Sequence, residues 1–82
     1  MANPGKFKLT SNTGPWIVID TVRRRYRVCN NSSSANIQVF YGDSGQSKIT
    51  IFPGCCIDVV GKKLRVLRTS TNSTVLGTYE EV

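Results

Sequence analysis

Apolar and polar residues alternate with a period of two along most of the chain, and no segment shows the longer period of an amphipathic helix. The alternating segments are rich in Val, Ile, Thr, Tyr and Phe, and Gly, Pro, Asn and Ser separate them. Turn residues recur roughly every 8 to 12 positions, which is typical of all-β proteins. The pattern predicts seven or eight short strands, at residues 6–9, 16–21, 24–30, 36–41, 47–52, 55–60, 63–69 and 74–80.

The short connections between these strands contain no helical crossover, which favours antiparallel pairing. We therefore predict an all-β fold: a small antiparallel β-sandwich (jelly-roll-like) or barrel of seven to eight short strands. The 82 residues are expected to form a single domain, with an extended N-terminal arm at 1–15 and a core at 16–82. The arm contains Pro4, Gly5, Gly14 and Pro15 and few core candidates, so we expect a partner to order it.

Two adjacent cysteines, Cys55 and Cys56, directly follow Pro53 and Gly54. Proline presets the backbone for the second position of a type II turn, and glycine tolerates the positive φ of the third. The turn leads into a strand in which alternate side chains face opposite sides. Alternation groups Cys55 with the core set and Cys56 with Asp58, on the more exposed face.

Cys29 makes the cysteine count three, an odd number that does not close a disulfide framework. The sequence lacks histidine and any Cys-x-x-Cys pair, so it predicts no metal or cofactor site. We interpret the cysteines as small buried apolar residues, and a Cys29–Cys55 or Cys29–Cys56 disulfide remains open. No carboxylates are paired for acid/base work, and we predict no catalytic residue and no enzyme activity.

Basic residues exceed acidic ones by 11 to 5, a formal net charge of +6. Such a balance favours acidic partners. Alternation places three arginines on the strand face opposite Tyr26 and Val28, and a second basic group on the strand at 63–69. In one sheet they would form a basic plateau, whose simpler interpretation is a solvated face that guards the sheet against aggregation. The predicted partner-binding residues are Lys6, Lys8, Arg23, Arg25, Arg27, Lys63 and Arg65.

Proteins that bind single-stranded nucleic acid place aromatic residues beside their cations, so that bases can stack. Here Tyr26 faces away from the arginines, and Trp16 and Tyr41 group with core residues. Phe40 shares a face with Gln38, which leaves the outer side open to it, but the aromatics as a group resemble core more than a stacking platform. A small basic nucleic-acid-binding β-barrel, such as a phage regulator or inhibitor, is therefore the alternative function rather than the first.

The layout from Tyr26 onward, "YRVCNNSSSANIQVFYGDSG" followed by "ITIFPGCCIDVVGKKLRV", resembles the small all-β virion accessory proteins of tailed bacteriophages. The resemblance implies a viral structural protein that decorates or cements a capsid, or builds a fibre, by oligomerising and docking on a protein lattice. It implies a virion location after synthesis in the host cytoplasm. The N-terminus has no apolar region of a signal peptide, and no apolar run is long enough to cross a membrane.

Overall fold

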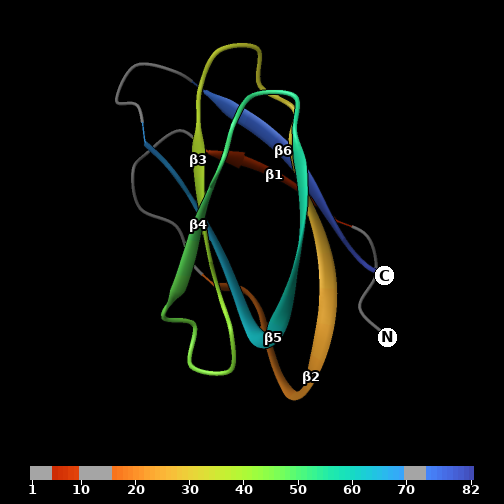
Figure 1. The fold of residues 1–82 in the computed structure, drawn as a ribbon. Coiled ribbons are helices and arrows are strands. Elements are labelled where there is room, and N and C mark those ends of the chain that lie inside the picture. Colours follow the sequence, from red (N-terminus) through yellow and green to blue (C-terminus); the bar gives the residue numbers. More distant parts are fainter. Residues whose placement is uncertain (1–4, 10–15, 70–73) are drawn as a thin grey trace.

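The computed structural model describes residues 5–9, 16–69 and 74–82, and these residues contain β-strands and no helix (Figure 1). The predicted all-β class is confirmed. The strands are β1 (Gly5–Leu9), β2 (Trp16–Asn30), β3 (Ile37–Tyr41), β4 (Ser47–Ile51), β5 (Cys56–Arg68) and β6 (Val75–Glu81).

All six strands belong to one antiparallel sheet with the order β1-β6-β2-β5-β3-β4. The long central strands β2 and β5 pair with each other, and the shorter strands lie outside them. β1 and β4 are therefore the two edges of the sheet. β1 corresponds to part of the predicted N-terminal arm, and residues 1–4 and 10–15 of that arm lie outside the described residues.

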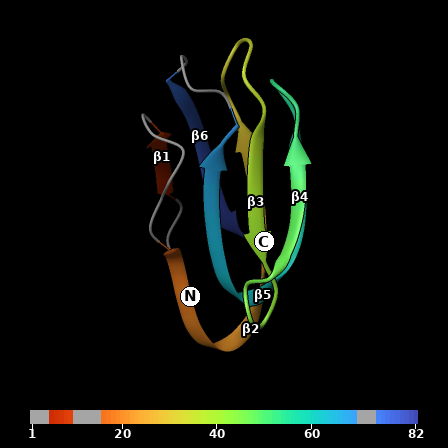
Figure 2. The same cartoon turned by 90° about the vertical axis from the view of Figure 1, so that its left-hand side faces the viewer.

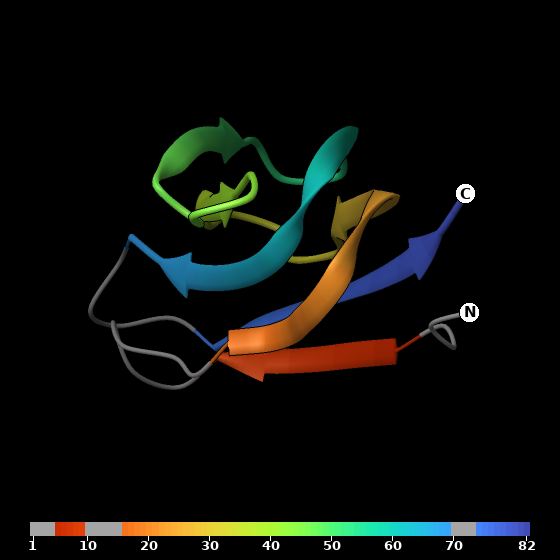
Figure 3. The same cartoon turned by 90° about the horizontal axis from the view of Figure 1, so that it is seen from below.

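The sheet folds over on itself because β2 and β5 both turn back at the lower end of the molecule (Figures 1 and 2). The first part of β2 and the last part of β5 form one layer with β3 and β4. The remaining parts of β2 and β5 form the other layer with β6 and β1. The view from below shows β2 and β5 passing from one layer to the other (Figure 3).

The bends explain why the described residues form six strands, whereas the pattern predicts seven or eight. The segments predicted at 16–21 and 24–30 are one strand, whose register shifts between Ile19 and Arg24. The segments predicted at 55–60 and 63–69 are likewise one strand, and Gly61 between them lies at the bend of β5. Gly61 is buried, and a Cβ there would lie 2.4 Å from Cα of Gly42. The absence of a side chain thus lets the loop after β3 pack against the bend, where the carbonyl of Gly42 accepts hydrogen bonds from the N–H groups of Lys62 and Lys63, both 3.2 Å.

The core lies between the two layers and follows the predicted alternation. Tyr26 and Val28 of β2 are buried, whereas Arg25 and Arg27 between and beside them are exposed. Burial of aliphatic and aromatic side chains is the main force that holds the layers together. The buried apolar residues are Phe7, Tyr26, Val28, Ala35, Ile37, Val39, Ile51, Val59, Leu64, Val66 and Val75.

The loop from Asn30 to Ala35 is anchored by a polar group, although the sequence shows no hydrophobic anchor there. The Asn30 side chain is fully buried and donates to the carbonyls of Ala35, 2.7 Å, and Ile51, 3.0 Å. Its carbonyl accepts hydrogen bonds from Ser32. Backbone bonds from Asn30 also reach Gly54 and Cys55.

The turn at 52–55 has the predicted type II geometry. The N–H of Cys55 donates to the carbonyl of Phe52, 3.1 Å, and Gly54 has a φ of +77°. The left-handed region is unfavourable for residues with a Cβ, so glycine suits this position. The prediction of a turn at Pro53–Gly54 that leads into the next strand is confirmed.

Candidate binding faces

The fold divides the seven predicted partner-binding residues between two outer faces of the sheet and the bend. Lys6, Lys8, Arg25 and Arg27 lie on the outer side of the layer that contains β1 and β6. Lys63 and Arg65 flank buried Leu64 and therefore lie on the outer side of the other layer. Arg23 lies at the bend of β2. The residues do belong to one sheet, but the folding of that sheet separates the expected basic plateau into two groups.

The first group belongs to what we call the mixed-charge face, because cations and carboxylates alternate on it. Arg27 lies directly between Asp58 of β5 and Glu80 of β6 in the register. Its Nε and Nη2 donate to the Asp58 carboxylate at 3.0 and 3.3 Å, and this bond lowers the pKa of Asp58. The residues of this face are Lys6, Lys8, Arg25, Arg27, Asp58, Val60, Leu76, Glu80 and Val82.

Three aliphatic side chains are exposed on the mixed-charge face. Val60 is 41% exposed, Leu76 51% and Val82 50%. The N–H of Val82 donates to the carbonyl of Arg25. Arg25 is also the register partner of Val60 on β5, so both valines flank this arginine. Apolar residues beside charges of both signs are typical of a surface that contacts other proteins.

A disulfide between Cys29 and Cys56 joins β2 to β5 in this layer, at the last pair of their register. The interpretation of the cysteines as buried apolar residues was wrong: Cys56 is exposed, and Cys55 is an exposed free thiol rather than a core residue. Cys56 rather than Cys55 forms the disulfide because the register of β2 and β5 places Cys56 directly opposite Cys29. Cys55 precedes the strand and belongs to the turn.

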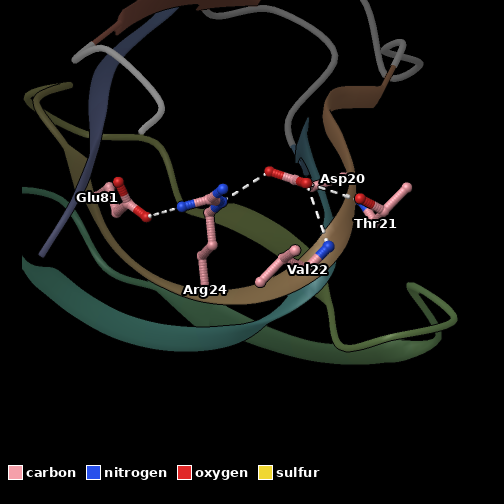
Figure 4. A network of polar contacts seen from close by, with 5 residues as sticks. All are labelled: Asp20, Thr21, Val22, Arg24 and Glu81. Atoms are coloured by element: carbon pink, nitrogen blue, oxygen red, sulfur yellow. Dashed lines mark hydrogen bonds and ion pairs between the residues drawn. The ribbon is translucent and has the colours of Figure 1, made fainter.

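Two arginines at the bend, Arg23 and Arg24, form ion pairs with carboxylates. Arg23 donates through Nε to Asp43 in the loop after β3, 3.2 Å, and lowers the pKa of that carboxylate. Arg24 lies on the inner side of the bend between Asp20, 2.7 Å, and Glu81, 2.8 Å (Figure 4). The bond from Arg24 lowers the pKa of Asp20, which also accepts hydrogen bonds from two backbone N–H groups at the bend.

Tyr26, two residues after Arg24, is 1% exposed. Its burial raises the pKa of the phenol, and the charges of Asp20 and Glu81 raise it further. Its hydroxyl has no hydrogen-bond partner among the described residues. Because Arg24 bonds both Asp20 and Glu81, it connects the β2 bend to the end of β6. We call these three residues the clasp.

The second outer face carries aromatic rings beside its cations, and we call it the cation–aromatic face. The guanidinium of Arg65 lies 4.6 Å from the ring centroid of Trp16 and 4.8 Å from that of Phe40. The ammonium of Lys63 lies 5.4 Å from the Trp16 ring. Trp16, Arg65, Phe40 and Lys48 are paired in one row across β2, β5, β3 and β4.

The assignment of Trp16 to the core was therefore wrong, whereas Phe40 lies on the outer side that the alternation left open to it. Trp16 is half-buried and stacks on Arg65, because its strand is paired there with the outward-facing part of β5. Lys48, which was not among the predicted residues, lies opposite Phe40 on this face. Its alternation with Ile49 and Ile51 was the signal that the sequence offered.

Four of the five Asp and Glu side chains form ion pairs with arginines that do not belong to the cation–aromatic face. Asp20 and Glu81 bind Arg24, Asp43 binds Arg23, and Asp58 binds Arg27. Glu80 lies on the mixed-charge face. Among the described residues, no ion pair involves Lys48, Lys63 or Arg65. The positive charge of this face is thus not neutralised by the protein itself.

Comparison with known proteins found no matching family model, no curated protein and no solved structure with significant similarity. Across residues 5–9, 16–69 and 74–82, no helix is long and apolar enough to cross a membrane. In the same residues, no three metal-ligating side chains come together.

Proposed function

We propose that this chain is a non-enzymatic structural module that associates with proteins through the mixed-charge face. In this proposal it is a virion protein, which oligomerises and docks on a protein lattice as a capsid decoration or cement protein. The observation that carries the proposal is the exposure of Val60, Leu76 and Val82 among charges of both signs, in the layer that ends in the open edge strand β1.

This combination suits protein association for two physical reasons. Exposed aliphatic groups lose contact with water when a partner covers them, which favours association. Alternating charges add register and selectivity, since a partner must place opposite charges against Arg25 and the Arg27–Asp58 pair. The edge strand β1 offers unpaired backbone groups, and Lys6 and Lys8 on it limit uncontrolled strand addition.

The virion context is supported by the similarity of the strand layout to phage accessory proteins and by the size of the domain. An 82-residue chain has a small core, and docking on a large lattice adds stability that the isolated domain cannot supply. The basic net charge would draw the module towards an acidic lattice surface.

The first test is the mass in solution, measured by size-exclusion chromatography with light scattering over a range of concentrations. We expect a discrete oligomer, and we expect Val60→Glu or Leu76→Glu to reduce it to the monomer. Thr50→Glu, an equivalent charge change on the opposite outer face, is the matched control and should leave the mass unchanged. A monomer at every concentration, or equal disruption by the control, would contradict oligomerisation through this face.

Docking is tested by co-sedimentation with capsids of the virus that encodes the chain. The wild-type chain should sediment with the particles at a fixed stoichiometry, and Arg25→Glu should weaken this at low salt. Sedimentation that is unaffected by changes on the mixed-charge face would require another docking surface.

A further inference from the structure

The cation–aromatic face differs from the mixed-charge face in both charge and chemistry. It combines three cations, Lys48, Lys63 and Arg65, with the rings of Trp16 and Phe40, and no ion pair with a carboxylate involves these cations among the described residues. On the mixed-charge face, in contrast, cations alternate with carboxylates. An uninterrupted positive field with ring faces instead fits a polyanion that also carries planar groups.

We propose that the cation–aromatic face binds single-stranded nucleic acid. In this arrangement bases stack on the exposed parts of Trp16 and Phe40, and phosphates lie beside Lys48 and Lys63. Stacking platforms combined with basic side chains are the general means by which proteins bind unpaired strands without reading their sequence. A duplex fits less well, because its bases are already stacked on each other and only its phosphates would contact the face.

The position of Arg65 favours this ligand. Two rings hold its guanidinium between them, and its Nε is buried with no hydrogen-bond acceptor among the described residues. A guanidinium fixed in one orientation loses little freedom when it binds a phosphate, which favours affinity. Trp16 and Phe40 are half-buried, so part of each side chain remains accessible to solvent.

The row across the sheet also gives the site a suitable extent. Trp16, Arg65, Phe40 and Lys48 occupy successive strands, and neighbouring strands lie about 4.8 Å apart. The row therefore spans roughly 14 Å, enough for a few nucleotides of an extended strand. This inference does not depend on the proposed docking function, because it concerns the opposite outer face.

The test uses the intact chain and the emission of Trp16, which is its only tryptophan. The probe is a fluorescein-labelled oligothymidylate of twenty nucleotides, titrated by anisotropy. The comparison probes are an abasic oligomer of the same length and polyglutamate. We expect the thymidylate to bind about tenfold more tightly than the abasic oligomer and to quench Trp16, since stacking adds about 1 to 3 kcal/mol per base. Equal binding of the abasic oligomer or of polyglutamate, or no binding at low salt, would overturn the inference.

The salt dependence of binding, measured for the wild type and for variants, separates the contribution of the phosphate contacts from that of base stacking. If the three cations neutralise about three phosphates, a plot of the logarithm of the association constant against the logarithm of the salt concentration should have a slope of about −2. The double variant Lys48→Ala with Lys63→Ala should reduce this slope by more than half. Phe40→Leu keeps an apolar side chain and should weaken the thymidylate about tenfold without changing the slope. Lys6→Ala with Lys8→Ala, on the other outer face, is the matched control. If this control weakens binding as much as the Lys48 and Lys63 changes, the proposed site is wrong.

Discussion

At the scale of single residues, Asn30 shows how one buried amide connects separate parts of the chain. Its side chain bonds the carbonyls of Ala35 and Ile51, and its backbone bonds the turn at 52–55. A buried amide is tolerated only when its hydrogen bonds are made. The polar loop after β2 and the Pro53–Gly54 turn therefore have fixed positions because both depend on this side chain.

We expect Asn30→Ala to lower the free energy of unfolding by about 2 kcal/mol, because it removes the side-chain donor from the carbonyl of Ile51 and one of the two donors from that of Ala35, which keeps its bond from Ser32 Oγ. Urea denaturation measures the difference. Asn31→Ala is the matched control: the neighbouring residue is exposed, and its replacement should change stability by less than about 0.5 kcal/mol. Equal stability of the two variants would show that other groups satisfy these carbonyls.

At the scale of elements, the pairing of β2 with β5 determines the shape of the molecule. Both strands run through both layers, so their pairing connects one layer to the other. The disulfide lies at the end of this pairing remote from the bend. The two long strands are thus joined covalently at one end of their pairing, and the loop after β3 packs through Gly42 against the bend of β5 at Gly61.

The double variant Cys29→Ala with Cys56→Ala should lose about 3 to 4 kcal/mol of stability, the value expected when a cross-link closes a loop of this size in the unfolded chain. Urea denaturation compares it with Cys55→Ala, which removes the free thiol only and should match the wild type. Titration of the native protein should find one reactive thiol, and three after unfolding and reduction. Three reactive thiols in the native, unreduced protein would contradict the cross-link.

At the scale of the whole molecule, the fold sorts charge by location. The bend and the mixed-charge face hold the carboxylates together with Arg23, Arg24, Arg25 and Arg27, whereas the cation–aromatic face holds cations only. The two outer faces therefore suit different partners. The two proposals accordingly assign a protein lattice to the mixed-charge face and an unpaired strand to the cation–aromatic face.

The pairing of carboxylates with arginines also predicts how the stability of the fold depends on pH. The pKa values of Asp20, Asp43 and Asp58 lie below their ordinary value of 3.8, chiefly because arginines donate hydrogen bonds to the carboxylates. The unfolded chain consequently binds protons more tightly than the folded one. The stabilisation is complete above the ordinary value and is lost as the pH falls through the lowered values, so acid unfolding should begin below about pH 4.

Arg24→Gln removes the donor shared by Asp20 and Glu81, and it should move the midpoint of acid unfolding to higher pH. Circular dichroism between pH 2 and pH 7 measures the midpoint. Arg25→Gln is the matched control, since Arg25 has no ion pair among the described residues. An unchanged midpoint for Arg24→Gln would show that the clasp at the bend contributes nothing to acid resistance.

Some features of the fold and of the site could be predicted from local patterns. The alternation of Arg23, Arg25 and Arg27 with Tyr26 and Val28 predicts which side chains are exposed. The same reasoning places Lys63 and Arg65 on an outer face. The Pro53–Gly54 turn follows from the backbone preferences of its two residues. Each of these properties depends on neighbours within a few positions.

Other features needed the tertiary structure. The alternation did not predict that β2 and β5 bend, and the bend separates the basic residues into two faces. Trp16 lies outside the core because of the strand it pairs with, and Cys56 rather than Cys55 meets Cys29 because of the register between distant strands.

By itself, the sequence determined that the protein is all-β, cationic and turn-rich, because alternation, charge and turn residues act over short stretches of chain. Only the tertiary structure decided which residues share a surface, which cysteines are joined and which cations lack a carboxylate. These properties depend on contacts between strands far apart in the sequence, and the register of such strands is set by packing of the whole sheet.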